Sequence, residues 1–451
     1  MSNDYKLSKD RLETKFQDAK PLYSESEAMI EANRCLYCFD APCIKACPTE
    51  IDIPGFIRKI ASGNNRGSAK TIFRSNMLGA STARVCPVEE LCAGACVYND
   101  LDNNPIQIGR LQRFATQKAL ESEKKSGRSL FKTAAPVDKK VALIGAGPAS
   151  LSCAAYLALE GVQTVIYEKS DLPGGLNTTG IAPYKFMAVD AIDEIKWLEK
   201  HGIDIRTGIE IGQDISLEKL VKDNDAVFFG IGLGKDTFSG IPGEELENVW
   251  GATELIRNIK NDPEFELPQD LNKAVVIGAG NTAIDIAREL AMLGVQEVDI
   301  VYRRTENDMP GYKHELVHAR EYGVRLLEKL TPIKISAGTD GGLKLFTEHT
   351  DSKASTTHHA DWIVMAIGTL KFAKELAPNL DINEKGCVIV DEKMRRTSIP
   401  NLYAGGDCIN GGKEVVNAVA DGRDAAHAML NSWGIDPVNS NQKKIEGNEY
   451  G

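Results

Sequence analysis

Two short cysteine-rich runs near the start of the chain carry the clearest chemical signal. The first run spans residues 35–48 and the second spans residues 86–96. Of the ten cysteines, these runs hold Cys35, Cys38, Cys43, Cys47, Cys86, Cys92 and Cys96. Packing alone gives no reason to gather so many thiols, whereas iron–sulfur clusters are each held by four ligands and use Cys-x2-Cys runs ending in Cys-Pro. Seven cysteines leave two four-ligand clusters one ligand short.

Two glycine-rich turns further along the chain predict two nucleotide sites. They read Gly145-Ala-Gly147-Pro-Ala-Ser150 and Gly278-Ala-Gly280-Asn-Thr-Ala283. Each turn joins an apolar strand to a helix, as in the G-x-G-x-x-G/A fingerprint, where a pyrophosphate lies on the helix N-terminus. We therefore expect cofactor contacts from Gly145, Gly147, Ser150, Gly278, Gly280, Asn281, Thr282 and Ala283.

The strand that follows each turn distinguishes the two nucleotides. The first strand ends at Glu168, whose carboxylate can accept hydrogen bonds from a ribose diol. At the matching place in the second unit stand Arg303 and Arg304, whose guanidinium groups suit a 2′-phosphate. The second unit is therefore expected to bind NADPH, with NADH as the alternative.

A later strand, residues 401–407, ends in Gly406 and Asp407, and a helix from about residue 414 follows. Asp407 is placed to bind the ribityl chain of a flavin, with the helix aimed at the flavin ring. Segments 226–232 and 363–369 resemble the crossover strands of two-dinucleotide-binding flavoproteins, which bind FAD in the first unit and NAD(P)H in the second. Further cofactor contacts are expected from Gly175, Gly368 and Val415.

The composition narrows the class of protein. The chain has 451 residues, a net charge of −11 and 42% hydrophobic residues. This acidity argues against nucleic acid as a partner, and no apolar run is long enough to span a membrane. The first residues lack the features of a secretory signal, so we expect a reducing, cytoplasmic location in which the cysteines bind metal.

The element pattern predicts an all-α iron–sulfur domain followed by two Rossmann-like α/β nucleotide-binding domains. Two short helices are expected within 54–78, one helix over 105–120, and a linker over 121–138. The expected domains are 1–130 for the clusters, 136–245 with 371–451 for FAD, and 246–370 for NAD(P)H.

This order of domains resembles the electron-input half of dihydropyrimidine dehydrogenase, particularly the flavoprotein subunit of the bacterial two-subunit form. It is also similar to the small subunit of glutamate synthase. The resemblance extends from Cys35 to Gly422 and implies two 4Fe–4S clusters. One cluster would be held by Cys35, Cys38, Cys43 and Cys96, and the other by Cys47, Cys86, Cys92 and Gln112.

The resemblance makes Gln112 informative in two ways, as a cluster ligand and as a marker of the family branch. Dihydropyrimidine dehydrogenases have a glutamine ligand at this place, whereas glutamate synthase small subunits tend to have an acid. Without the missing ligand, Gln112 would be interpreted as an ordinary helix residue beside an apolar face.

The resemblance implies that NAD(P)H is oxidised at FAD and that electrons leave singly through the clusters. The acceptor would be an FMN-containing partner subunit that reduces uracil or thymine, in a hetero-oligomer. The alternatives are a glutamate synthase small subunit or related NAD(P)H:ferredoxin-type oxidoreductase and, from another class, a non-catalytic scaffold. The intact glycines and cysteines argue against the scaffold.

Three other features of the sequence carry weaker functional signals. Where the family has an Arg in a loop near the flavin, this chain has Lys185, which keeps the charge but not the planar fork. The run His314-Glu-Leu-Val-His318 matches a zinc-protease motif by coincidence, since no third ligand is evident. The remaining cysteines are expected to be buried apolar residues, and no Cys-x-x-Cys follows residue 96 that could exchange disulfides.

Overall fold

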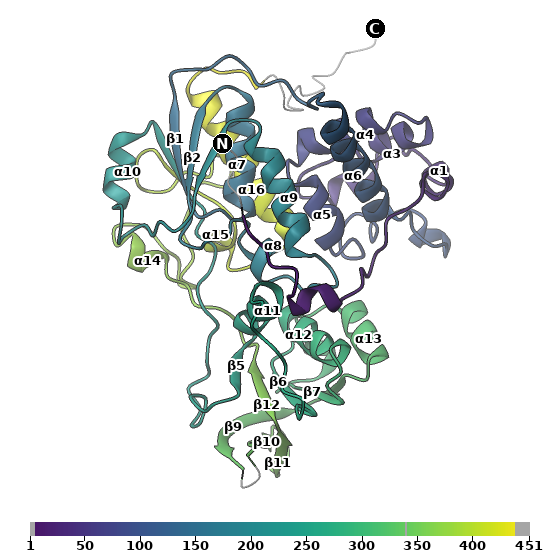
Figure 1. The fold of residues 1–451 in the computed structure, drawn as a ribbon, viewed down its shortest axis with the longest axis vertical. Helices are drawn as coiled ribbons and strands as arrows, with labels where there is room; N and C mark the ends of the chain where they lie inside the picture. The colour runs from purple at the N-terminus through teal and green to yellow at the C-terminus, as the bar shows by residue number, and fades with distance from the viewer. Residues whose placement is uncertain (1–4, 339–340, 438–451) are drawn as a thin grey trace.

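The computed structural model describes residues 5–338 and 341–437 and shows three parts (Figure 1). The two expected domain limits at residues 1 and 451 lie outside the described residues. The cysteine-rich part contains η1 (Leu12–Lys15), α1 (Glu25–Asn33), α2 (Pro42–Lys45), α3 (Ile53–Ala61), α4 (Asn65–Ser75), α5 (Gly79–Val85), η2 (Asn99–Leu101) and α6 (Ile108–Ser126). The two short helices expected within 54–78 are confirmed as α3 and α4.

Local capping explains where these helices begin. Asp52 and Asn64 each accept a hydrogen bond from a backbone N–H in the first turn of α3 and α4, and Ser24 forms a capping box with Glu27 at α1. The apolar faces of α3, α4 and α6 pack together around Phe56, Ile72, Leu111 and others. This core supports the loops that carry the cysteines.

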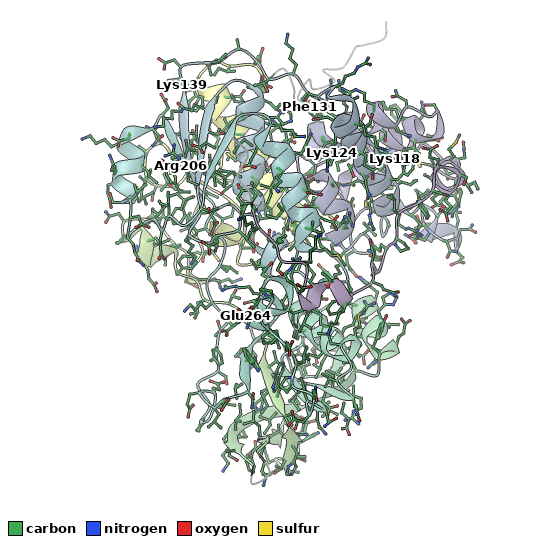
Figure 2. The ribbon with its side chains drawn as sticks, viewed as in Figure 1. Lys118, Lys124, Phe131, Lys139, Arg206 and Glu264 are labelled. Carbon is green, nitrogen blue, oxygen red and sulfur yellow. The ribbon has the colours of Figure 1, made fainter. Side chains whose placement is uncertain are left out.

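The prediction of a linker from residue 121 was wrong, because α6 continues to Ser126 and ends at Gly127. The charged run 121–125 is helical, and its Glu123 is buried, where it accepts hydrogen bonds from Leu130 N (2.7 Å) and Trp197 Nε1 (3.2 Å). Phe131 then packs into the core of the first α/β unit (Figure 2). The segment that follows α6 is therefore packed against both the helical part and the first α/β unit.

The first α/β unit is a parallel sheet in the order β13-β4-β1-β2-β3. Its strands are β1 (Lys140–Ile144), β2 (Gln163–Tyr167), β3 (Ile203–Arg206), β4 (Ala226–Phe229) and β13 (Leu402–Ala404). The edge strand β13 returns from the far end of the chain and pairs with β4 from Leu402 opposite Val227. The accompanying helices are α7 (Pro148–Leu159), α8 (Leu176–Thr179), α9 (Ala188–Glu199), α10 (Leu217–Asp223), α14 (Ala373–Leu376), α15 (Asp407–Asn410) and α16 (Val415–Ser432).

The second α/β unit is also a parallel sheet, in the order β5-β12-β6-β7-β8. Its strands are β5 (Val249–Gly251), β6 (Lys273–Ile277), β7 (Glu297–Val301), β8 (Arg325–Leu327) and β12 (Trp362–Met365). The helical elements of this unit are α11 (Ala252–Asn261), α12 (Asn281–Met292), η3 (Glu306–Asp308) and α13 (Lys313–Glu321). An antiparallel sheet that the sequence did not predict lies at its far end in Figure 1 and contains β9 (Leu330–Ala337), β10 (Leu343–His349) and β11 (Ser355–Ala360).

The N-terminal segment lies where the three parts meet, as its dark purple colour shows in Figure 1. Leu12 and Phe16 pack in the core of the second α/β unit. Glu13 accepts a hydrogen bond from Ala188 N in the first unit (2.6 Å), and Arg11 Nε donates to Lys260 O in the second (2.6 Å). One short segment therefore ties both nucleotide units together.

Lys260 forms the other half of this connection. Its fully buried Nζ donates to Ile181 O (2.8 Å) and Phe186 O (2.7 Å) in a loop of the first unit and lies 3.9 Å from Glu13. Burial lowers the pKa of Lys260 to about 8, since the charged form loses its hydration. In the part of the chain that the structure describes, no helix has the length and apolar content to cross a membrane.

Replacing Lys260 with Met removes the donor from three carbonyl groups of the first unit, those of residues 177, 181 and 186. Buried carbonyls left without a partner cost roughly 2–4 kcal/mol in total, so we expect the Tm to fall by roughly 5–10 °C. Differential scanning fluorimetry measures the change. The exposed Lys385, replaced in the same way, is the control and should leave the Tm almost unchanged. Equal Tm values for the two variants would contradict the bridging role of Lys260.

Candidate functional site

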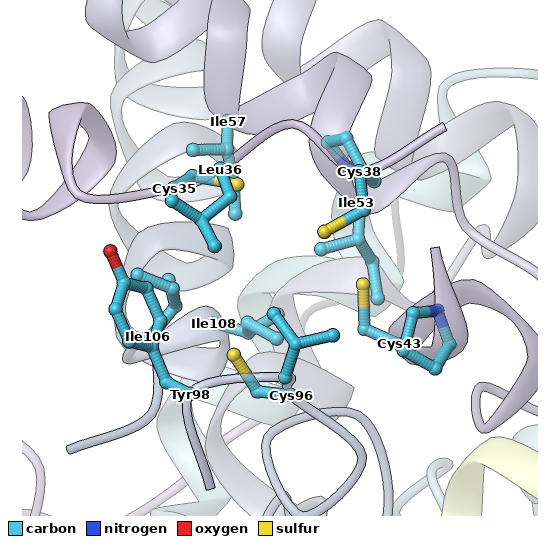
Figure 3. Close-up of a pocket in the computed structure, with 13 residues that line it drawn as sticks. Cys35, Leu36, Cys38, Cys43, Ile53, Ile57, Cys96, Tyr98, Ile106 and Ile108 are labelled. Atoms are coloured by element: carbon cyan, nitrogen blue, oxygen red, sulfur yellow. The ribbon is translucent and has the colours of Figure 1, made fainter. Parts of the chain in front are cut away.

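The first cysteine set lines one pocket in the helical part. Cys35 and Cys38 come from the loop after α1, Cys43 lies on α2, and Cys96 ends the second cysteine run. Figure 3 shows the four sulfur atoms pointing into a common space. The remaining wall is mostly apolar and includes Ile53, Ile57, Ile106 and Ile108. The structure thus brings together the four cysteines expected to share a cluster.

Aromatic side chains hold the loops of this pocket. The Tyr37 hydroxyl donates to Ala32 O (3.1 Å), and the Arg58 guanidinium lies over the Tyr37 ring, 4.8 Å from its centroid. The Tyr98 hydroxyl donates to Arg34 O (2.8 Å) across the two cysteine runs. Both runs are therefore anchored to the end of α1.

The second cysteine set lines another pocket. Cys47, Cys86 and Cys92 lie there together with Gln112 from the buried face of α6. Val416, in the first turn of α16, also lines this pocket. Asn76 lines the pocket as well, but its Oδ1 already accepts a hydrogen bond from Leu78 N (3.1 Å) and its Nδ2 donates to Thr82 Oγ1. Gln112 is therefore the amide that matches the missing cysteine.

Two partners fix the orientation of the Gln112 amide. Its Nε2 donates to Gly79 O (2.8 Å) and to Thr82 Oγ1 (3.1 Å), both on α5. Thr82 is itself held by Asn76 Nδ2, which donates to its hydroxyl (2.9 Å). With the nitrogen held in this way, the carbonyl oxygen Oε1 is the amide atom left to act as a ligand.

Helix α5 is held in turn by the first α/β unit. The buried Glu194 of α9 accepts hydrogen bonds from Ala80 N (2.8 Å), Ser81 N (3.0 Å) and the Ser81 hydroxyl. Burial raises the pKa of Glu194 to about 7, although these donors oppose the shift. The nucleotide unit thus positions the helix on which the Gln112 amide rests.

Burial disfavours the thiolate form of several cysteines in both pockets, as it does for the buried Cys408 outside them. Burial raises the pKa of Cys43 and Cys92 to about 12 and that of Cys86 well above its usual value. Such thiols keep their proton at neutral pH unless a metal displaces it. Among the described residues no three His, Cys, Asp or Glu side chains converge as they would on one ion. Thiols arranged around a space instead suit a cluster, in which each ligand binds a different iron.

The two glycine-rich turns have the same shape. A Cβ at Gly145 or Gly278 would lie 2.7 Å from Gly230 O or 2.2 Å from Ala366 O, and both glycines have left-handed backbone, with φ of 82° and 124°. A Cβ at Gly147 or Gly280 would meet nothing within 4 Å. Open space therefore lies before the N-termini of α7 and α12, where a pyrophosphate would fit. The small Ser150 and Ala283 are buried against their strands.

The other residues expected at the first nucleotide surround its turn. Glu168 accepts hydrogen bonds from Ala146 N (2.7 Å) and Ser170 N (2.8 Å), which orient its carboxylate beside the turn. A Cβ on Gly175 would lie 3.0 Å from Gly147 Cα, and one on Gly406 would lie 3.1 Å from Ala149 Cβ.

Asp407 and Val415 begin the two helices that follow Gly406. Asp407 is the first residue of α15, where it accepts a hydrogen bond from Lys413 N (3.2 Å), and burial raises its pKa. Val415 is the first residue of α16 and is half-buried. Both residues thus lie on the segment that links the first nucleotide turn to the second cysteine pocket.

The second nucleotide unit leaves its basic residues available. Arg303 is exposed, as is Arg304, and neither forms an ion pair within residues 5–338 and 341–437. Asn281 accepts a hydrogen bond from Tyr312 N (2.9 Å), while Thr282 is exposed at the first turn of α12. Gly368 borders open space.

Lys185 lies in a contact between the two nucleotide units. Its Nζ pairs with Asp285 of α12 (2.7 Å) and Glu315 of α13 (2.8 Å). Burial alone would lower the pKa of Lys185, but the two carboxylates raise it above the usual value. The Lys185 side chain thus joins the loop of the first unit to two helices of the second.

The two histidines of the zinc-protease motif have separate acidic neighbours. His314 Nδ1 lies 3.4 Å from Glu90 of the cysteine-rich part, while His318 Nδ1 lies 3.3 Å from Glu321. Only the structure reveals the Glu90 partner of His314, because these residues are far apart in the sequence, whereas His318 and Glu321 are three residues apart on α13.

Two cysteine pockets beside a pair of Rossmann-like units define an NAD(P)H-dependent flavin and iron–sulfur oxidoreductase that supplies electrons to an acceptor. Residues 12–124 match the family described as dihydropyrimidine dehydrogenase domain II, 4Fe-4S cluster. Residues 139–422 match the family described as pyridine nucleotide-disulphide oxidoreductase. The chain belongs to this oxidoreductase family, in the group that carries an N-terminal 4Fe–4S domain.

Two relatives from Escherichia coli (strain K12) match the chain over most of its length and of their own. The chain is 36% identical over 413 residues to the NAD-dependent dihydropyrimidine dehydrogenase subunit PreT, covering 91% of this chain and 95% of the relative. It is 33% identical over 438 residues to the glutamate synthase [NADPH] small chain, covering 91% and 92%.

Solved structures show the fold of the α/β part. The T. acidophilum thioredoxin reductase superposes with a TM-score of 0.53 at 19% identity, covering 66% of this chain and 99% of that one. The Mycobacterium tuberculosis FprA in complex with NADPH gives a TM-score of 0.52 at 20% identity, covering 66% and 85%.

The two glycines of the second turn should respond differently to an added methyl group. Gly280→Ala has room for its Cβ and should keep the parent Tm, but the methyl fills the space for the pyrophosphate and should raise the KM for NAD(P)H roughly tenfold. Gly278→Ala meets Ala366 O and strains the backbone, so its Tm should fall. Steady-state kinetics and thermal melting separate the two effects. An unchanged KM for Gly280→Ala would show that the pyrophosphate does not lie there.

Proposed function

We propose that this protein is the electron-input subunit of a dihydropyrimidine dehydrogenase, and Gln112 in the second cysteine pocket is the observation that carries the proposal. NAD(P)H is oxidised at FAD in the first α/β unit, and electrons leave singly through two 4Fe–4S clusters. The acceptor is an FMN-containing partner subunit that reduces uracil or thymine. When bound, the flavin supplies two-electron chemistry with the nicotinamide and the clusters supply one-electron transfer.

The roles of the chain's own residues follow from their positions. One cluster is held in the first cysteine pocket by Cys35, Cys38, Cys43 and Cys96, and we call it the outer cluster. The other is held in the second pocket, farther from the surface, by Cys47, Cys86, Cys92 and Gln112, and we call it the inner cluster. Glu168 and Asp407 orient the flavin nucleotide, while Arg303 and Arg304 recognise a 2′-phosphate. No side chain is needed as a general acid or base, because the residues bind and orient groups that carry the chemistry. We assign residues 1–130 to the clusters, 136–245 with 371–451 to FAD, and 246–370 to NAD(P)H.

The surroundings of Gln112 favour an amide over a carboxylate. Gly79 O can only accept a hydrogen bond, and Gln112 Nε2 supplies the donor. A glutamate here would turn a carboxylate oxygen toward that carbonyl. Both oxygens can only accept, so the hydrogen bond to Gly79 O would be lost. This argues for the dihydropyrimidine dehydrogenase type over the glutamate synthase type, for which an acid is expected. Glutamate synthase remains the second candidate, because its small chain is similar over the same extent.

Replacing Gln112 with Leu should disturb one cluster and spare the other. The parent should contain about eight irons and one flavin per chain, and the variant about four irons, because only the inner set loses a ligand. Iron and sulfide analysis with electron paramagnetic resonance measures this. Gln117→Leu, on the same helix but outside the pocket, is the control. Retention of both cluster signals in the Gln112 variant would end the ligand assignment.

Replacing Arg303 and Arg304 together with Ala should change the nicotinamide preference. Loss of charge-assisted hydrogen bonds to a 2′-phosphate should raise the KM for NADPH roughly tenfold or more, with little effect on NADH. Parallel kinetics with both nucleotides measure the effect. Arg257→Ala on the exposed face of α11 serves as the charge control. A parent enzyme that uses NADH as well as NADPH would contradict the assignment.

The native complex tests the acceptor directly. The tagged chain is purified with its partner from the source organism under anaerobic conditions. We expect NAD(P)H-dependent loss of uracil or thymine and a partner that contains FMN. Formation of glutamate from 2-oxoglutarate and glutamine would instead establish the second candidate.

A further inference from the structure

Apolar side chains are exposed around the first cysteine pocket. Phe39, directly after Cys38, is fully exposed, and Leu36 is 54% exposed while lining the pocket. Leu101, on the loop that follows Cys96, is 59% exposed. Leu36 lines the pocket, Phe39 adjoins Cys38 in the sequence, and Leu101 lies on a loop whose Val97 and Tyr98 line the pocket. Large exposed apolar side chains on neighbouring segments mark an interaction site. We call Leu36, Phe39 and Leu101 the exit patch.

Hydrogen bonds join the segments that carry the exit patch. The Tyr98 hydroxyl binds Arg34 O (2.8 Å), and the Arg34 guanidinium donates to Asn104 O (2.5 Å). Arg34 also lies over the Tyr98 ring, with 5.4 Å from Cζ to the centroid. The loop 97–104 is therefore fastened to the segment that leads into Cys35, and both border the same pocket.

The two cysteine pockets differ in their access to the surface. Two of the three cysteines of the second set, Cys47 and Cys92, are buried, while Cys86 is partly exposed. This pocket also touches Val416 on the helix that begins at the flavin side. All four cysteines of the first set are partly exposed, and the exposed Leu36 lies among them. The second set is therefore the inner one, and electrons that leave the chain cross the surface at the first set.

The charges near the exit patch have one predominant sign. Asp100 and Asp102 flank Leu101 and are exposed, and Asp40 follows Phe39. Lys45 lies 2.7 Å from Asp40 and Arg34 lies 2.8 Å from Glu31, so the charges of these two pairs cancel. Arg58 is exposed over the Tyr37 ring, and Asp100 and Asp102 are the acids of this rim that form no ion pair within the described residues. An apolar centre with an acidic rim is complementary to a partner with an apolar centre and a basic rim.

We propose that the exit patch is the docking surface for the electron-accepting protein, and that this protein meets it with an apolar patch rimmed by Lys and Arg. The inference deepens the proposed function and rests on it, because the patch surrounds the outer cysteine set. Docking here brings the acceptor against the loop of Cys35 and Cys38. The apolar side chains supply contact, and the acidic rim speeds encounter and sets orientation.

Mitochondrial cytochrome c, a basic one-electron acceptor protein, is the probe, and ferricyanide is the small acceptor for comparison. The parent holoenzyme is compared with the double variant Leu36→Ser/Phe39→Ser, with superoxide dismutase present. The variant should lose roughly fivefold or more in kcat/KM for cytochrome c, mainly through KM. Its iron content, flavin reduction by NAD(P)H and ferricyanide rate should match the parent. Ile333→Ser, 46% exposed on β9, is the matched control and should behave as the parent.

A second pair of variants tests the acidic rim. Asp40→Lys/Asp100→Lys should weaken cytochrome c reduction and flatten its dependence on ionic strength, because screened attraction is lost. Glu384→Lys/Glu392→Lys, exposed on another part of the chain, should change neither. Equal effects of the patch and control variants would overturn the proposal.

The same variants distinguish other occupants of the patch. If the parent is a dimer that Leu36→Ser/Phe39→Ser converts to a monomer, the patch binds a second copy of the chain and the proposal is wrong. The failure of the proposed function would be visible separately, as a parent that lacks iron or does not oxidise NAD(P)H. The acceptor subunit of the native complex should show the same loss with the patch variant as cytochrome c does.

Discussion

The buried contact between Glu194 and helix α5 is the interaction on which the arrangement of the redox groups depends. Removing a carboxylate from water costs several kcal/mol, and this cost is offset only while the donors stay in place. Those donors are Ala80 N, Ser81 N and the Ser81 hydroxyl, all at the start of α5. Any slip between the nucleotide unit and the helical part would leave a buried carboxyl group without its hydrogen-bond partners, so the contact favours one relative position of the two parts.

Two further buried contacts hold the second nucleotide unit against the first. Lys260 reaches the carbonyls of residues 181 and 186, and Lys185 in the same loop reaches back to Asp285 and Glu315. The loop is therefore held at several points by opposite charges and by hydrogen bonds. Lys185 serves this contact as a compact charge between two carboxylates, which requires no planar fork. A fixed contact of this kind keeps the second α/β unit from moving freely against the first.

Local chemistry made much of the fold predictable from the sequence. The strands and helices on either side of Gly145 and Gly278 lie where the apolar runs and glycines predict them, because the turn itself needs those glycines. The end of α6 was missed because the charged run 121–125 looked solvated, although Gly127 was a stop signal. Glu123 faces inward to meet Trp197, a partner that no local pattern reveals. The antiparallel sheet β9–β11 was missed as well, because Pro332 and charged residues interrupt the apolar pattern of β9 and β10, and β11 is polar apart from its last residue.

The candidate site, like the fold, has a part that the sequence predicted and a part that it did not. The grouping of the cysteines followed from a family resemblance, and the pockets bring the same residues together. The contacts that orient them join residues far apart in sequence, such as Gln112 with Gly79 and Glu194 with Ser81. These pairs depend on how whole helices pack, and spacing along the chain carries no trace of them.

The missing cysteine has a physical explanation in the proposed ligand sets. Thiolates repel one another, and the repulsion grows as water is excluded. In the outer set the four cysteines are all partly exposed, although burial raises the pKa of Cys43 there to about 12. In the inner set burial raises the pKa of Cys92 to about 12 and that of Cys86 well above its usual value, and this set holds the two buried thiols among the seven, Cys47 and Cys92. A neutral amide in the fourth place removes one negative charge from the pocket that contains these two buried thiols, so Gln112 suits that pocket.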